Sequence, residues 1–308
     1  MFSFKTPTLK SSVVLVVVLS TFLAASGSVL QAGKGGSAAS RRIVTLNVIA
    51  HAPEGRQVTR EDFDLYDSGT AQEIESFARL DTGSRIVLMV DGSSNLRAEP
   101  AALQKAVEAV VSELYADDQM MIVGYNEAAE IIEDMTPDLK LLEAASSKLT
   151  RKGFPNLFDA LIAVTDALSH QAKSGIEKRA IILISDGYDS ESKTKFDDAL
   201  RALQDENIVL YAIQTPDRTR GALLRDKPKP PMALERITEG TGGTIFPFDK
   251  VAGAAKTIAD DLRKNWYRLV YAPSGINTIN VRRLLLMSHD PKIELRTKGS
   301  HPSKYHSN

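Results

Sequence analysis

One short segment constrains the fold of this chain more than any other. Residues Ile86–Val90 form an unbroken apolar run, which is long enough for a strand and too short for most helices. Such a run is typical of a strand buried on both faces, as in the middle of a parallel sheet. Oxygen-bearing side chains follow it directly: Asp91, Ser93, Ser94 and Asn95. Because ligands of open α/β sheets bind just beyond the carboxyl ends of the strands, these residues are candidates for a hard-cation site.

A second wholly apolar run ends in the same way. Residues Ala180–Ile184 precede Ser185 and Asp186, so the two aspartates converge if the two strands are neighbours in a parallel sheet. Helical spacing alternates with further short strands, which predicts a mainly parallel, Rossmann-like α/β sheet flanked by helices. The predicted strands are 86–90, 120–125, 129–135 (at an edge), 180–184 and 208–214, and the predicted helices are 103–114, 139–149, 157–168, 196–203 and 251–266.

Alternating patterns predict small β extensions at both ends of this α/β domain, which we place at 84–266. Within the N-terminal extension, 42–83, apolar and polar residues alternate in Arg42–Ala50, which predicts a strand. Residues Ile74–Leu80 are predicted to form a further strand. We expect this unit to cover an edge of the main sheet. The C-terminal tail, 267–308, is β-like again.

Two connecting segments inside the α/β domain have a distinctive composition. Arg218–Pro231 contains several prolines, which exclude a helix interior, and we expect an exposed loop. The glycine-rich segment Gly240–Thr244 lacks the lysine of a phosphate-binding loop, and we interpret it as a helix end before a strand.

The N-terminus has the layout of a secretory signal peptide. Lys5 and Lys10 precede an apolar run, Val13–Ala25, and small residues follow. We therefore predict a signal peptide over 1–32, a flexible linker over 33–41, and export to the periplasm or the extracellular space. The alternative is an uncleaved N-terminal membrane anchor. No other segment of the sequence is apolar for long enough to span a bilayer.

Composition excludes several classes of partner and chemistry. The net charge is −1 and no basic patch is interleaved with aromatic residues, so nucleic acid is not the expected partner. The chain has no cysteine, which excludes disulfides, thiolate metal sites and cysteine nucleophiles. With 43% hydrophobic and 25% charged residues, the sequence is typical of a globular protein.

The residues at the two strand ends resemble the von Willebrand factor A (VWFA) domain, and in particular its secreted bacterial VWFA-related group. The metal-ion-dependent adhesion site (MIDAS) of that family begins with Asp-x-Ser-x-Ser after the first strand of the sheet, and here this position reads Asp91-Gly92-Ser93-Ser94-Asn95. A glycine-rich turn with a threonine corresponds to Gly153–Ala160, and a final Thr-Asp-Gly corresponds to Ser185-Asp186-Gly187. The flanking segments 55–69 and 242–271 also resemble the group, so the likeness covers the chain beyond the signal peptide.

The match departs from the family motif at two ligand positions. Asn95 stands where the motif has its third hydroxyl, and Pro155, which has no ligating side chain, stands where it has threonine. Asn156 is next to the missing threonine. The resemblance therefore implies a degenerate, weakened site for Mg²⁺ (or Mn²⁺ or Ca²⁺), with Asp91, Ser93, Asn95, Asn156 and Asp186 as its candidate ligands.

Structural roles are the alternative for each of these residues. Asp91 and Asp186 could close the following loops through side-chain hydrogen bonds to the backbone, and Ser93 could be a loop hydroxyl. We expect Asp159 to be a first-turn acid favoured by the helix dipole. We expect Asp189 to be a solvated loop acid.

The resemblance implies an exported, non-enzymatic module that binds a protein partner through the carboxyl ends of the strands, with a weakened divalent cation completed by an acidic side chain of the partner. The alternative is an ion-independent envelope scaffold or interaction domain in which the metal site is a relic. A hydrolase is disfavoured because none of the five histidines lies near either motif and no Gly-x-Ser-x-Gly segment is present.

Overall fold

The computed structural model describes residues 43–170, 178–222, 227–276 and 281–301. Residues 42–308 form one compact unit. The predicted signal peptide, 1–32, and linker, 33–41, lie outside the described residues. Within the ranges described, no helix combines the length and apolar character that crossing a membrane requires.

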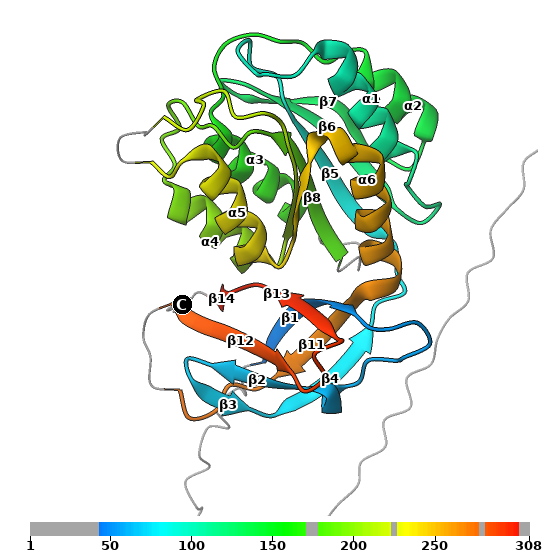
Figure 1. Ribbon diagram of the computed structural model, residues 1–308, viewed down its shortest axis with the longest axis vertical. Coiled ribbons are helices and arrows are strands. Elements are labelled where there is room, and N and C mark those ends of the chain that lie inside the picture. The colour runs from blue at the N-terminus through cyan, green and yellow to red at the C-terminus, as the bar shows by residue number, and fades with distance from the viewer. Residues whose placement is uncertain (1–42, 171–177, 223–226, 277–280, 302–308) are drawn as a thin grey trace, which may run out of the picture. The chain divides into compact units, whose positions relative to one another are not determined.

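The centre of the chain is a six-stranded sheet with the order β10-β9-β8-β5-β6-β7 (Figure 1). All neighbours pair in parallel except β6 and β7, which are antiparallel. The predicted mainly parallel α/β sheet is therefore confirmed, with β5 in its middle and β7 at an edge. Its strands are β5 (Ser84–Asp91), β6 (Gln119–Tyr125), β7 (Ala129–Thr136), β8 (Lys178–Ser185), β9 (Val209–Gln214) and β10 (Ile245–Pro247).

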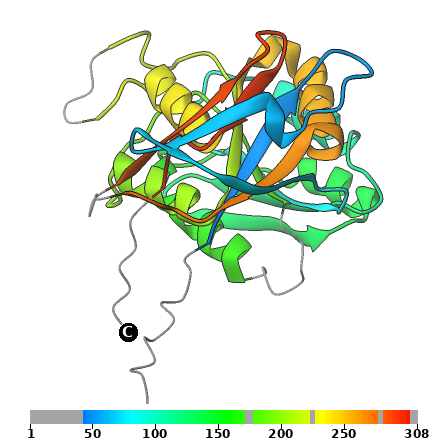
Figure 2. The same cartoon turned by 90° about the horizontal axis from the view of Figure 1, so that it is seen from below.

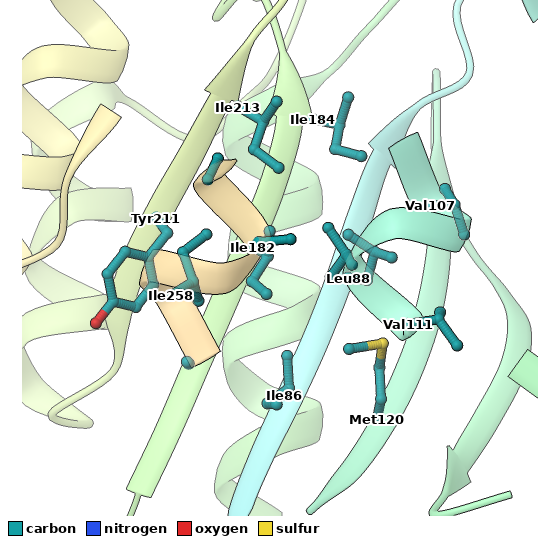
Figure 3. Close-up of a cluster of buried hydrophobic side chains, with 14 of the residues drawn as sticks. Ile86, Leu88, Val107, Val111, Met120, Ile182, Ile184, Tyr211, Ile213 and Ile258 are labelled. Carbon is teal, nitrogen blue, oxygen red and sulfur yellow. The ribbon is translucent and has the colours of Figure 1, made fainter. Parts of the chain in front are cut away.

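Helices cover both faces of this sheet, because each central strand is apolar on both sides of its pleat. On one face, α1, α2 and α6 pack on side chains such as Ile86 and Leu88 (Figure 3). On the other face, α3, α4 and α5 pack on residues such as Val87 and Met89. The helices are α1 (Pro100–Val111), α2 (Leu139–Ser146), α3 (Leu157–His170), α4 (Phe196–Asp205), α5 (Pro230–Thr241) and α6 (Val251–Asp260).

The proline-rich segment differs from its prediction in one respect. The expected loop over 218–231 ends at Pro230, where α5 begins, because proline is compatible with the first turn of a helix and only excluded from its interior. The helix ends at Thr241, and Gly242 after it has the left-handed conformation with φ +83°, as expected for a helix end before a strand. The predicted helix 251–266 also ends earlier, since α6 continues into a short π-helical turn, η4 (Asp261–Asn265).

The two β extensions pair with each other. One four-stranded sheet has the order β13-β1-β11-β4, and a second has the order β14-β12-β2-β3. The blue and cyan N-terminal strands lie beside the orange and red C-terminal ones in Figure 2. The expectation that the N-terminal unit covers an edge of the main sheet is therefore wrong. The strands are β1 (Val44–His51), β2 (Phe63–Asp67), β3 (Thr70–Gln72), β4 (Ile74–Arg79), β11 (Trp266–Tyr271), β12 (Arg282–Ser288), β13 (Glu294–Thr297) and β14 (Ser300–His301).

A hydrophobic core explains this pairing. Alternate residues of β1, including Leu46 and Val48, are fully buried against residues of β2, β11 and β12 such as Leu65 and Leu269. An alternating strand has one apolar face to bury, and the extensions bury theirs against each other.

Candidate functional site

The two aspartates that follow the apolar strands are brought together. β5 and β8 are parallel neighbours, with Val90 opposite Ile184, so Asp91 and Asp186 lie at the same edge of the sheet. Both side chains are fully buried. Two buried carboxylates at one point need a cation or a proton to compensate their charge.

The compensating cation is the guanidinium of Arg218. Its Nε donates to Asp186 Oδ2 at 2.7 Å, and its Nη2 donates to Asp186 Oδ1 at 2.9 Å and to Asp91 Oδ2. Its Nη1 donates to Ser93 Oγ at 2.7 Å and to Asn95 Oδ1 at 2.6 Å. Every N–H of the guanidinium therefore has an acceptor, and all of the acceptors belong to the expected metal site.

Burial and backbone contacts hold Arg218 in this position. Its side chain is only 5% exposed, and its guanidinium carbon lies 5.2 Å from the centre of the Tyr188 ring. The backbone N–H of residue 218 also donates to Asp186 Oδ2, at 2.9 Å. The neighbouring Asp217 accepts hydrogen bonds from the backbone of Thr219 and Gly221, which fixes the turn that carries the arginine. The prediction that this part of the loop is exposed is therefore wrong for the Arg218 side chain.

A second layer of hydrogen bonds orients Asp91. Its Oδ1 accepts from the backbone N–H of Ser93 at 2.9 Å and from the Ser93 hydroxyl. Its Oδ2 lies 3.5 Å from the Ser185 hydroxyl, which accepts a hydrogen bond from Tyr125 Oη at 2.8 Å. Asp186 Oδ1 likewise accepts from the backbone N–H of Tyr188, at 3.1 Å. The loop-closing roles considered for the two aspartates and Ser93 are thus present, alongside the contacts to Arg218.

Burial and charge shift the ionisation of this cluster. Burial raises the pKa of the Asp91 carboxyl, and the charge of Arg218 and the hydrogen bonds from Ser93 only partly offset that shift. Burial alone would lower the pKa of Arg218, but hydrogen bonding to Asp186 and the charges of Asp91 and Asp186 outweigh it and raise that pKa. The guanidinium is therefore charged at any physiological pH. Burial, together with the charge of Asp91, raises the pKa of Tyr125 well above its ordinary value.

Arg151 fixes the loop that carries Ser93 and Asn95. Its guanidinium donates to the backbone oxygens of Ser93 at 3.2 Å and of Ala98 at 2.8 Å, and also contacts those of Ser94 and Leu96. The loop is further joined to the turn after α2, because the Ser94 backbone N–H and hydroxyl both donate to the Gly153 carbonyl.

Asn156, the fifth predicted ligand, is engaged elsewhere. Its Nδ2 donates to the Glu127 carbonyl at 3.3 Å, and its Oδ1 accepts from the Glu191 backbone N–H at 3.1 Å. The structure therefore brings together Asp91, Ser93, Asn95 and Asp186, whereas the Asn156 side chain joins two other loops.

Of the two acids in α3 and its neighbouring loop, Asp159 lies in the first helical turn as predicted, whereas Asp189 differs from expectation. Asp189 is only 3% exposed rather than solvated, since it accepts from the backbone N–H of Phe158 at the start of α3 and pairs with Lys227 at 2.7 Å. Asp159 accepts hydrogen bonds from the backbone of Lys193 and Thr194, so it holds this loop as well as lying in the first helical turn.

The donor set does not fit a divalent cation while Arg218 is in place. The oxygen atoms expected to bind the ion are the acceptors of the guanidinium, and two like-charged groups cannot share them. Pro155 has no ligating atom, and Asn156 is held by Glu127 and Glu191. In the part of the chain that the structure describes, no group of three or more His, Cys, Asp or Glu side chains could hold a metal ion.

Sequence reasoning missed Arg218, although one signal pointed to it. The residue follows β9, which is parallel to β8, so it emerges at the same edge of the sheet as Asp186. Two aspartates predicted at the ends of buried strands require a positive charge, and the loops at that edge were the place to look for one.

Comparisons with known proteins give a family match and several similar solved structures. Residues 86–188 match the von Willebrand factor type A domain family. No curated protein matches the chain. Similar solved structures include an aerotolerance-related membrane protein from Bacteroides fragilis NCTC 9343, with 16% identity and a TM-score of 0.47 over 59% of this chain and 100% of that chain. BatB, a conserved hypothetical protein from Bacteroides thetaiotaomicron, has 16% identity and a TM-score of 0.46 over 59% of this chain and 98% of that chain. A von Willebrand factor type A protein from Catenulispora acidiphila has 13% identity and a TM-score of 0.49 over 80% of this chain and 74% of that chain.

Proposed function

We propose that this chain, of which residues 86–188 match the von Willebrand factor type A domain family, is an exported, non-enzymatic protein-binding module whose binding needs no divalent cation. Domains of this family are generally protein-interaction modules. Export is supported by the signal-peptide pattern of residues 1–32.

The observation that carries the proposal is the Arg218 guanidinium at the carboxyl ends of β5 and β8. A metal-dependent module needs an ion with an open position for a carboxylate of the partner. Here the corresponding oxygens of Asp91 and Asp186 bind an internal cation whose N–H groups all have acceptors inside the protein. Recognition through an ion is therefore replaced by recognition through the surrounding loops.

The same cluster supports a role without catalysis. The Ser93 hydroxyl donates to Asp91 and accepts from Arg218, and Ser93 and both aspartates are fully buried. A nucleophile needs access to a substrate and a base that can take its proton. Ser93 has no such access, and its carboxylate neighbour is paired with an arginine.

An exposed aromatic residue marks the surface that we assign to the partner. Phe154 is 57% exposed and directly follows Gly153, whose carbonyl is bonded to Ser94 in the loop of the arginine cluster. Asn95 and Arg97 on that loop are exposed as well. An exposed aromatic side chain beside polar and positively charged groups is typical of an interface anchor.

Site-specific photocrosslinking in the native cell tests the proposal. A photoreactive phenylalanine analogue at position 154 is expected to crosslink one defined protein, and the yield should not change with EDTA. The same analogue at Leu285, which is 54% exposed on β12, is the matched control and should not capture that protein.

Purified components complete the test. The captured protein should bind the purified chain, and Phe154→Asp should weaken binding by about tenfold or more, which corresponds to the loss of an interface anchor. Equal capture from both positions, or loss of binding in EDTA, would contradict the proposal.

A further inference from the structure

We infer that Arg218 is a built-in substitute for the metal ion, and that the oxygen cluster around it is a latent divalent-cation site that opens when the arginine side chain is removed. This inference rests on the proposed ion independence, but it concerns the isolated chain and needs no partner.

The guanidinium meets the atoms that a cation would use. Its acceptors are carboxylate oxygens of Asp91 and Asp186, the hydroxyl of Ser93 and the amide oxygen of Asn95. All of these are hard oxygen donors, which Mg²⁺, Mn²⁺ and Ca²⁺ prefer. One or two carboxylates with additional waters are sufficient for Mg²⁺. The side chains thus already converge on one point, and the arginine is the group that excludes an ion from it.

The cluster is held in place by contacts that do not involve the guanidinium. Asp91 accepts from the Ser93 backbone, and Asp186 accepts from the backbone N–H groups of Tyr188 and Arg218. The loop with Ser93 and Asn95 is fixed by Arg151, which donates to the Ser93 carbonyl at 3.2 Å. Truncating the side chain at 218 therefore leaves the oxygen donors and their supports in position.

The negative charges of Asp91 and Asp186 favour a divalent ion in place of the Arg218 guanidinium. The two buried carboxylates share the positive charge of Arg218, and among the described residues no other cation pairs with either of them. A buried pair of like charges strongly attracts a cation. A divalent ion in the space left by the guanidinium would neutralise both carboxylates.

Manganese binding to the purified, chelator-treated chain tests this inference. The wild-type protein is expected to show no saturable Mn²⁺ binding by electron paramagnetic resonance or calorimetry. Arg218→Ala is expected to bind one Mn²⁺ with a Kd on the order of 10⁻⁴–10⁻³ M or tighter, the range of weak calcium modules outside cells. Mg²⁺ and Mn²⁺ should also raise the Tm of Arg218→Ala while leaving that of the wild type unchanged.

Two matched variants identify the site. Arg236→Ala removes an exposed arginine, on α5, and should behave as the wild type. Arg218→Ala combined with Asp186→Asn should lose the Mn²⁺ binding of Arg218→Ala.

A third variant, Arg218→Gln, tests the inference if Arg218→Ala does not fold. Arg218→Gln keeps part of the side-chain stem and should also bind Mn²⁺, more weakly than Arg218→Ala. A folded Arg218→Ala or Arg218→Gln protein, verified by circular dichroism, that binds no Mn²⁺ would overturn the inference, and so would saturable Mn²⁺ binding by the wild type. Because the crosslinking experiment uses wild-type Arg218, a failure here and a failure of the proposed binding function remain distinct results.

Discussion

Two buried cations in this chain behave differently because of their acceptors. Arg218 lies between two carboxylates, whose charges raise its pKa. Lys298 is 4% exposed, and its Nζ donates to neutral oxygens, the Gln204 carbonyl at 2.8 Å and Asn207 Oδ1 at 2.6 Å. Burial lowers the pKa of Lys298 to about 8, because the charges of Asp205 and Glu206, which Arg282 opposes, offset only part of the effect of burial. A buried cation thus keeps its proton to a higher pH where opposite charges accompany it.

The lowered pKa of Lys298 predicts stability that rises with pH. Between pH about 8 and about 9.5 the native side chain has lost a proton that the unfolded one, with a pKa of 10.5, still binds. The unfolded state therefore binds more protons, and the free energy of unfolding should increase with pH by at most about 1.4 kcal/mol per unit from this residue. Urea denaturation across this range measures the slope. Lys298→Met should reduce it, whereas Lys292→Met, at an exposed lysine, should not; an unchanged slope in Lys298→Met would refute the assignment.

At the scale of elements, the glycine after the end of β8 lets the start of α5 pack closely against it. Gly187 follows Asp186 and has φ +82°. A Cβ atom there would meet the Pro230 carbonyl oxygen and lie 2.7 Å from Leu234 Cγ. This close approach places the first turn of α5 directly beside the aspartate that binds Arg218. The glycine is therefore needed both for its backbone conformation and for the helix–loop contact.

Gly187→Ala should destabilise the fold by about 1–3 kcal/mol, from the left-handed backbone and the steric overlap with α5. Gly253→Ala is the matched control, because it lies in α6 with nothing within 4 Å of its added Cβ. It should be neutral or stabilising by up to about 1 kcal/mol, as alanine favours a helix over glycine. Chemical denaturation of both variants gives the comparison, and equal stabilities would show that the close approach is unimportant.

At the scale of the whole molecule, the two ends of the chain depend on each other. β1 lies between β11 and β13, so a strand near residue 45 has both of its neighbours beyond residue 265. Buried polar contacts join these strands to the α/β part as well: Asp261 pairs with His51 at 2.7 Å and with Arg296 at 2.6 Å, and accepts from Tyr211 at 3.1 Å. Each of the two small sheets is therefore built from strands of both extensions.

Removing only the C-terminal strands should be worse than removing both extensions. A chain of residues 42–266 keeps β1 and β4 without their partner β11, and should aggregate through unpaired edges and exposed apolar residues such as Leu46. A chain of residues 84–266 keeps the six-stranded sheet, and should be more soluble, with lower stability than the full chain. Size-exclusion chromatography with circular dichroism distinguishes them. A monomeric, cooperatively unfolding 42–266 chain would show that the extensions fold separately.

The sequence alone predicted the central strands of the main sheet, which depend on local pattern. The apolar runs Ile86–Val90 and Ala180–Ile184 identified central strands, because burial on both faces leaves no polar position in the pleat. The acids that follow them identified the edge where a site would lie. The order of the motifs also indicated the von Willebrand factor A fold, which the structure and the family match confirm.

Only the tertiary structure determined which groups meet. Arg218 is separated from Asp91 by 127 residues, and its route to the carboxylates depends on a turn held by Asp217 and on the burial that the surrounding loops provide. The strands of the terminal extensions could likewise pair with several sheet edges, and the local pattern does not show which pairing occurs. Periodicity reports which face of an element is apolar, and it carries no information about which distant partner will cover that face or neutralise a buried charge.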